Sequence, residues 1–324
     1  MNLIKKILSI VLRVGISLLI LWYLFRQVDR KSLLETIRHS DKVLLFIAFI
    51  IYQLSNLFCI LRWAMLLKAS EVRLPLRRVI LSFSGGMFFN LFLPSSIGGD
   101  LMRSIDLARH TKKSKEVVAT VLLDRLSGYI GLVIITLLAV LIGGKLIDNP
   151  SVTVSVLIIT GILVVSMVVL FNKKIYSFIN TKLDSPQAGK IKEYIRNLHH
   201  QIHIFRHNRG VILNNIGLSL LVQITGPLVY YLMAYSMGLK LKLIYFFVYI
   251  PIIGAVSMLP ISIGGLGLRD ATTIYFFGKA GVAKDMAFAM SLVNFSFILI
   301  TGLAGGLIFY VFTVRHRRLQ HHKQ

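Results

Sequence analysis

The chain has 324 residues, of which 56% are hydrophobic and only 15% charged, and its mean hydropathy is +0.74. Soluble domains carry about a quarter charged residues, so these values exclude an ordinary soluble protein and indicate a polytopic membrane protein. The single cysteine, Cys59, excludes an internal disulfide and a thiolate metal cage. The net charge of +24 comes from short basic stretches between apolar runs, which argues against nucleic-acid binding and is typical of cytoplasmic loops.

Six apolar runs are as long as a membrane-spanning helix, about 20 residues, or longer. The first follows a basic start, and no small-residue cleavage site comes after it, so we interpret it as a retained span rather than a removed signal peptide. Arg62 and Trp63 follow the second run and are residue types that suit the headgroup level, so we predict an interface there. The six runs cover residues 7–25, 43–61, 126–144, 151–171, 211–239 and 286–314.

Two further apolar segments contain helix-breaking residues that a spanning helix avoids. Residues 79–103 contain Pro94 and two Gly-Gly pairs, and the basic stretches on both flanks favour the same side of the bilayer. Residues 243–269 contain two prolines and four glycines. We predict that each segment forms a re-entrant helical hairpin. For residues 79–103 a full span is the alternative, because the length also fits one.

An eleven-residue stretch at 93–103 recurs at 259–269, with seven identical positions: Leu, Pro, Ser, Ile, Gly, Gly and Arg. When the N-terminus is placed inside, the order span, hairpin, span occurs twice with opposite orientation. Most of the 37 Lys and Arg residues then lie on the cytoplasmic side, as do both termini. An inverted repeat of this kind is typical of transporters whose site opens alternately to the two faces.

We therefore predict one integral membrane domain, residues 1–324, of the all-α polytopic class, with about six full transmembrane helices and two re-entrant helical hairpins in an inverted-topology repeat. Its parts are a first half, 1–171, with hairpin 79–103; a cytoplasmic connector, 172–210; a second half, 211–314, with hairpin 243–269; and a basic cytoplasmic tail, 315–324. The Gly302-x-x-x-Gly306 spacing favours close helix contact and allows a homodimer.

The paired glycine-rich stretches carry the candidate site. A Gly-Gly turn exposes backbone amides, and an arginine follows about one helical turn later, so two such stretches entering from opposite faces would make a cationic pocket for a phosphate. The alternative is that the glycines allow tight packing and the arginines anchor helix ends at the headgroups. The predicted substrate-binding residues are Arg103, Arg269, Ser96, Ser262, Gly98, Gly99, Gly264, Gly265, Asp100, Asp270, Asp124, Arg125 and Arg62.

The acidic residues beside the arginines have two interpretations. Asp100, Asp124 and Asp270 are expected to pair with the arginines, because an unpaired buried charge is costly; a proton-coupling role is the alternative. No Walker loop, nucleophile elbow or metal-ligand motif occurs, so we predict neither an enzyme nor a metal or other cofactor. His199, His203 and His207 would share one helical face, which we interpret as solvated and basic.

The order and spacing of these motifs resemble the transmembrane, flippase-like region of lysylphosphatidylglycerol synthases, over about residues 5–314. The motifs are Arg62-Trp63, Leu93-Pro94 through Gly98-Gly99-Asp100 with Arg103, Asp124-Arg125, and Leu259-Pro260 through Gly264-Gly265 and Gly267 to Arg269-Asp270. In two-part members this region is held to flip aminoacylated phosphatidylglycerol, while a C-terminal soluble domain performs aminoacyl transfer. Here the sequence stops ten residues after the last predicted span, and Asp124 and Asp270 stand where the family is expected to carry Glu.

The resemblance implies a lipid flippase of the inner or plasma membrane without synthase activity. Its substrate would be an anionic phospholipid or, as in other free-standing relatives, a polyprenyl-phosphate-linked lipid. The alternative hypothesis is a non-transporting accessory subunit of an envelope lipid or glycolipid biosynthesis complex, with a separate lipid-modifying enzyme as its partner.

Overall fold

The computed structural model describes residues 2–93, 97–143, 209–257, 262 and 264–315, and the single residues 154, 157, 158, 161 and 165. Within these residues the fold contains helices and no strand, which confirms the predicted all-α class. The helices are α1 (Asn2–Gln27), α2 (Arg30–His39), α3 (Lys42–Ala69), α4 (Leu76–Asn90), α5 (Ile97–Thr111), α6 (Ser114–Gly143), α10 (Arg209–Ser236), α11 (Leu243–Ser257), α12 (Leu268–Lys279) and α13 (Lys284–Phe309), which continues as a π-helix over Tyr310–Arg315.

Four helices of the described part, α3, α6, α10 and α13, are long and apolar enough to cross a membrane. Large hydrophobic side chains remain exposed along them, including Phe46, Leu141, Leu213 and Leu307. A water-soluble protein would bury such groups, whereas lipid tails accept them. The predictions of spans at 43–61, 126–144, 211–239 and 286–314 are therefore confirmed.

Other predicted segments are described less fully. The first predicted span lies in α1, whose apolar portion is described from Gly15 to Gln27. The predicted span 151–171 and the connector 172–210 lie almost wholly outside the described residues, which include only five single helical positions of the former and residues 209–210 of the latter. Residues 316–324 of the predicted tail are also outside them.

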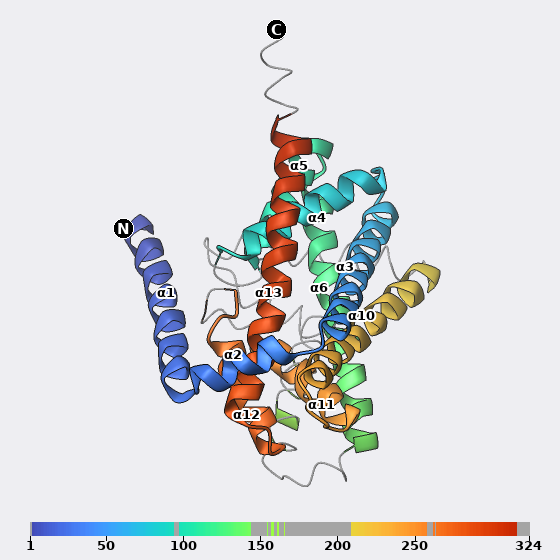
Figure 1. Cartoon of the computed structure of the whole chain (residues 1–324). Helices are drawn as coiled ribbons and strands as arrows, with labels where there is room; N and C mark the ends of the chain where they lie inside the picture. Colours follow the sequence, from blue (N-terminus) through green and yellow to red (C-terminus); the bar gives the residue numbers. More distant parts are fainter. Residues whose placement is uncertain are drawn as a thin grey trace.

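The described helices form two sets with the same order: a long helix, two short helices and a long helix. These are α3, α4–α5 and α6 in the first half, and α10, α11–α12 and α13 in the second. In Figure 1, α3 ascends and α6 descends, whereas α10 descends and α13 ascends. The short pair α4–α5 lies near the upper end and α11–α12 near the lower end. The two halves thus have opposite orientations, as the repeated stretch predicts.

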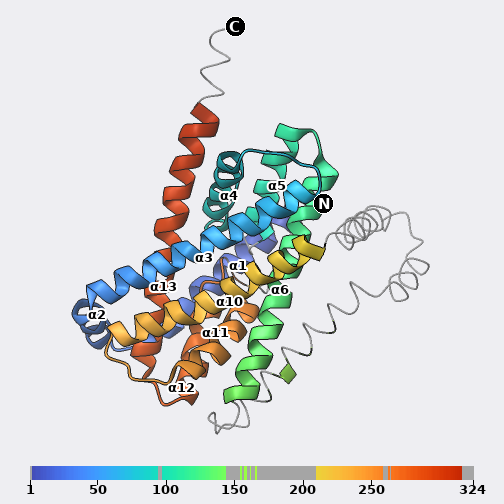
Figure 2. The same ribbon diagram turned by 90° about the vertical axis from the view of Figure 1, so that its right-hand side faces the viewer.

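The two halves pack together through equivalent pairs of helices. Helices α3 and α10 run side by side with opposite directions (Figure 2), α4 packs on α13, and α11 packs on α6. The side chain of Gln53 on α3 donates from Nε2 to Thr301 Oγ1 on α13 (2.7 Å), and Gln223 on α10 donates from Nε2 to the carbonyl oxygen of Gly128 on α6 (3.3 Å). Each first helix is therefore hydrogen-bonded to the last helix of the opposite half.

Glycines allow α13 to approach α4 closely. A Cβ on Gly305 would lie 2.8 Å from the carbonyl oxygen of Ser84, and one on Gly302 would lie 2.7 Å from a methyl carbon of Leu91. The small-residue face of α13, including Gly306, is thus covered within the chain. Its spacing gives no argument for a homodimer, which stays a prediction.

Both interrupted segments form antiparallel helix pairs. Helix α4 ends at Asn90 and α5 begins at Ile97, and residues contact across the pair in reverse order, with Ser82 donating to the carbonyl of Arg103 and Arg78 pairing with Asp106. In the second half, the rings of Tyr249 and Phe276 pack together. Neither segment is a continuous helix, so an unbroken span over residues 79–103 is excluded.

Candidate functional site

The first turn of α5 is held against α4 by two glycines. A Cβ on Gly86 would lie 2.9 Å from the carbonyl oxygen of Gly99, and a Cβ on Gly99 would overlap the carbonyl oxygen of Gly86. The Gly99 N–H donates to Asn90 Oδ1 (2.7 Å), which ties the start of α5 to the end of α4. This contact fixes the positions of Asp100, in the first turn of α5, and of Arg103, in its second turn.

Five charged side chains from α3, α5 and α6 form one chain of alternating sign. Asp124 accepts from Arg62 Nε through Oδ1 (2.7 Å) and from Arg103 Nη2 through Oδ2 (2.9 Å). Asp100 Oδ1 forms an ion pair with the same Arg103 nitrogen (2.9 Å), and Asp100 Oδ2 accepts a hydrogen bond from Arg125 Nε. Three guanidinium groups face two carboxylates, so this cluster carries one excess positive charge.

Three of these charges, Arg62, Asp124 and Arg125, lie inside their helices rather than at the ends. Arg62 is 6% exposed and Trp63 fully buried, and α3 continues past both of them to Ala69. The helix therefore does not end at Arg62 and Trp63, and their position at a membrane interface stays a prediction. Arg62 can be buried within α3 because Asp124 neutralises it and Ser219 on α10 accepts a further hydrogen bond from Arg62 Nη1 (3.1 Å).

Arg103 retains unused donors despite its burial. Its guanidinium lies 4.5 Å above the ring of Trp63 and 5.2 Å from that of Phe83, so the rings stabilise the charge. The Nε and Nη1 atoms nevertheless have no hydrogen-bond partner among the described residues. Buried polar groups almost always have a partner. Arg103 is 4% exposed, so these two donors are an exception to that rule, and their chemistry suits an anion.

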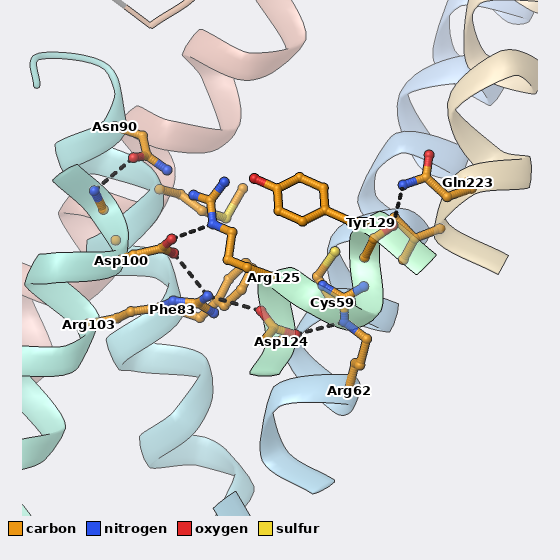
Figure 3. A pocket seen from close by; sticks show the side chains of 15 residues that line it. Cys59, Arg62, Phe83, Asn90, Asp100, Arg103, Asp124, Arg125, Tyr129 and Gln223 are labelled. Atoms are coloured by element: carbon orange, nitrogen blue, oxygen red, sulfur yellow. Dashed lines mark hydrogen bonds and ion pairs between the residues drawn. The ribbon is translucent and has the colours of Figure 1, made fainter. Parts of the chain in front are cut away.

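A cavity of about 240 Å³ lies beside this cluster. Figure 3 shows that Arg125 and Asp100 reach it from one wall, whereas Gln223 and Cys59 come from the other side. Pockets that enclose a whole drug-sized ligand are about 300 Å³ or larger. This cavity therefore fits the polar headgroup of a lipid better than a whole lipid. Its lining includes Cys59, Arg62, Phe83, Asn90, Gly99, Asp100, Arg103, Asp124, Arg125, Tyr129 and Gln223.

The second glycine-rich stretch forms a separate buried cluster. Gly264, Gly265 and Gly267 have φ of +56°, +76° and +79°, a region that side chains with a Cβ rarely adopt. The Gly267 N–H donates to Asp270 Oδ2 (2.8 Å) and closes the start of α12. Arg269 donates from Nη2 to Asp270 Oδ1 (3.0 Å), and Asp270 is fully buried.

Helix α13 completes this second cluster. Ser291 Oγ accepts from Arg269 Nε (3.2 Å) and donates to Asp270 Oδ1, and the ring of Phe295 lies 5.5 Å from the Arg269 guanidinium. Arg269 itself is 6% exposed. Each arginine of the repeated stretch is thus bound to the last helix of its own half: Arg103 to α6 and Arg269 to α13.

The predicted site residues are only partly brought together. Arg269 and Ser262 are not among the residues that line the cavity, so the single pocket shared by both arginines is not found there. The physical reason is that the arginines bind different last helices. The two stretches do approach the same residue, Asn90 at the end of α4: its side chain accepts from the Gly99 N–H, and a Cβ on Gly264 would lie 3.5 Å from its carbonyl oxygen. Ser96 lies outside the described residues, Gly98 in the first turn of α5, and Ser262 is buried with no hydrogen-bond partner among the residues described.

Residues 10–306 match the family model of the lysylphosphatidylglycerol synthase TM region. The chain belongs to this family. It is 24% identical over 302 residues to a UPF0104 membrane protein of Methanothermobacter thermautotrophicus, covering 85% of this chain and 88% of the relative. A UPF0104 membrane protein of Pyrococcus horikoshii is 23% identical over 329 residues, covering 94% and 96%. No solved structure matches this chain.

Membership confirms the resemblance drawn from the motifs, and it places the cavity in a lysylphosphatidylglycerol synthase transmembrane region. Sequence reasoning missed three polar residues of this cavity, Asn90, Tyr129 and Gln223. Asn90 is an uncharged polar residue at the end of an apolar segment, four residues before Pro94, and that position was the available signal. Ser291 was missed as well, because a serine in an apolar run has nothing in its sequence context to connect it to Arg269.

Substitution of Gly99 by alanine is expected to weaken the packing of α5 on α4. The added methyl group would overlap both the carbonyl oxygen of Gly86 and the side chain of Asn90, so α4 and α5 must separate, which costs about 1–3 kcal/mol. Gly217 on α10 is a matched control, because a Cβ there meets nothing within 4 Å. Thermal unfolding in detergent should show a lower Tm for G99A and an unchanged or higher Tm for G217A. Equal Tm values would contradict the close packing.

Proposed function

We propose that this membrane protein moves an anionic phospholipid, or a polyprenyl-phosphate-linked lipid, between the leaflets of the cell membrane. The observation that carries the proposal is a cavity lined by three arginines, Arg62, Arg103 and Arg125, and by two aspartates, Asp100 and Asp124. Together these five side chains carry a net charge of +1. Charged groups within spanning helices are costly and are retained where they line a substrate path. The proposed role is transport alone, without aminoacyl transfer.

The chemistry of the cluster favours a phosphate group. Guanidinium groups bind phosphate oxygens with charge-assisted hydrogen bonds, and Arg103 has two donors free for this purpose. A zwitterionic or neutral headgroup would leave the excess positive charge uncompensated. A headgroup-sized cavity between lipid-exposed helices allows the acyl or polyprenyl chains to stay in the bilayer while the headgroup crosses.

The opposite orientation of the two halves supports movement between faces. In carriers built from inverted repeats, one half opens where the other is closed, and the two states exchange these roles. In this structure the Arg103 cluster borders a cavity, whereas Arg269 is enclosed by Asp270 and Ser291. We propose that the second cluster binds the headgroup in the alternate state, with each hairpin re-entrant from its own face and both termini cytoplasmic.

Reconstitution tests the function directly. The purified protein in liposomes is expected to accelerate the exchange of fluorescent phosphatidylglycerol between leaflets, measured by dithionite quenching, and to leave fluorescent phosphatidylcholine at the rate of empty liposomes. Exchange of neither lipid would favour the accessory-subunit hypothesis, because such a subunit has no transport activity of its own.

The native cysteine gives a second test of where the headgroup binds. Cys59 is the only cysteine in the chain and lines the cavity, so a thiol reagent reports on this site without background. Short-chain phosphatidylglycerol is expected to slow the labelling of Cys59 by a methanethiosulfonate reagent at least several-fold. Short-chain phosphatidylcholine should not, and the C59A variant should show no labelling. Equal protection by both lipids would argue against a phosphate-selective cavity.

A further inference from the structure

The two carboxylates of the charged cluster are not equivalent. Asp124 is enclosed, with 5% of its side chain exposed, and holds Arg62 and Arg103 together between α3, α5 and α6. The side chain of Asp100 is 17% exposed and that of its partner Arg125 is 23% exposed, and both line the cavity. Of the two acids, Asp100 is therefore the one that an entering ligand can reach.

The position of Asp100 is also one that suits a phosphate. Its two oxygens each contact a different guanidinium: Oδ1 forms an ion pair with Arg103, and Oδ2 accepts a hydrogen bond from Arg125 Nε. Figure 3 shows its carboxylate between these two side chains. Two oxygens of one phosphate bridge paired arginines in the same way. Asp100 also lies in the first turn of α5, where the helix dipole favours a negative group.

A carboxylate in this position must weaken the binding of any other anion. A ligand phosphate can occupy the position between Arg103 Nη2 and Arg125 Nε only if Asp100 leaves it, although Arg103 Nε and Nη1 are unpartnered in either case. With Asp100 in place, the cluster also offers one excess positive charge rather than two. A carrier benefits from this competition, because a site that conducts must bind weakly enough to release its ligand.

We propose that Asp100 is a built-in competitor, whose carboxylate occupies the anion position between Arg103 and Arg125 in the empty site and is displaced by the phosphate of the lipid. The inference rests on the proposed function, and it adds a residue that sets affinity and release. When the lipid leaves, Asp100 returns to the two arginines, so the excess positive charge of the empty site stays at one rather than two.

The test is equilibrium binding of dihexanoyl phosphatidylglycerol to the full-length protein in detergent, by titration calorimetry. Loss of one competing charge in D100N is expected to lower Kd by about ten-fold. The matched control is D106N, which removes a carboxylate of the same helix that binds Arg78 (2.7 Å) and does not line the cavity; its Kd should stay within about two-fold of wild type. D100S serves as a second variant with the same expected direction.

The outcomes separate this inference from the proposed function. If wild type binds the lipid and both Asp100 variants bind it equally or more weakly, Asp100 is a structural partner and the inference is overturned. If neither wild type nor the Asp100 variants bind it, both ideas fall. A parallel titration with inorganic phosphate identifies the source of the anion. If D100N binds inorganic phosphate more tightly than wild type but does not bind the lipid more tightly, Asp100 does compete with an anion, and the lipid is not that anion.

Transport adds a readout that a merely structural role would not produce. D100N is expected to bind more tightly yet exchange labelled phosphatidylglycerol more slowly at saturating lipid, because release becomes limiting. A structural partner would lose affinity and exchange together, with a lowered Tm.

Discussion

Replacement of Arg103 by alanine is expected to reduce the exchange of phosphatidylglycerol in proteoliposomes to the level of empty vesicles. The variant loses the unpartnered Nε and Nη1 donors and the charge excess of the cluster. Charge-assisted hydrogen bonds contribute about 1.5–3 kcal/mol each, so loss of two corresponds to at least roughly 100-fold weaker binding of the phosphate. The dithionite assay described above measures the effect.

The R103A protein should nevertheless remain folded. Asp124 keeps Arg62 as a partner and Asp100 keeps Arg125, so neither carboxylate is left buried without a cation. R109A is the matched control, because Arg109 is an exposed arginine in the last turn of the same helix. R103K should recover only part of the activity, since an ammonium group cannot serve two carboxylates and stack on Trp63 as a guanidinium does. Exchange at the wild-type rate in R103A would remove this cavity from the transport path.

The spans were predictable because they depend on a property that adjacent residues share. An uncharged run long enough to cross the hydrocarbon was sufficient to locate α3, α6, α10 and α13. The boundaries were less accurate. The predicted span 43–61 stops before Arg62, whereas α3 continues to Ala69. The predicted span 126–144 starts after Arg125, whereas α6 begins at Ser114.

Both errors have one cause. Charges that look like helix ends in the sequence are paired across helices in the structure, and the partners Arg62 and Asp124 are 62 residues apart. No local pattern contains that pairing. The repeat predicted the inverted order of the helices, but not the different partners of its two arginines. Arg103 binds Asp124 on α6, whereas Arg269 binds Ser291 on α13 and an aspartate next to itself.

Replacement of Asp270 by asparagine is expected to cause the largest loss of stability among the single substitutions considered. Asp270 is fully buried and accepts hydrogen bonds from the Gly267 N–H, Arg269 and Ser291. Without its charge Arg269 becomes a buried, uncompensated cation, and breaking such a pair costs about 3–5 kcal/mol. Thermal unfolding in detergent should show a strongly lowered Tm. D41N is the control, because Asp41 is an exposed helix cap and asparagine caps helices equally well.

A double substitution then separates stability from binding at Arg269. Arg269→Met together with Asp270→Asn removes both charges, so the cost of the unpaired cation disappears and the Tm should recover most of what D270N loses. If Arg269 binds the headgroup when the second half opens, this stable double variant should still fail to exchange phosphatidylglycerol. Its Cys59 should remain protected by the lipid, because the Arg103 cavity is intact. Exchange at the wild-type rate would instead show that Arg269 and Asp270 only hold α12 against α13, and that the Arg103 cluster alone carries the headgroup.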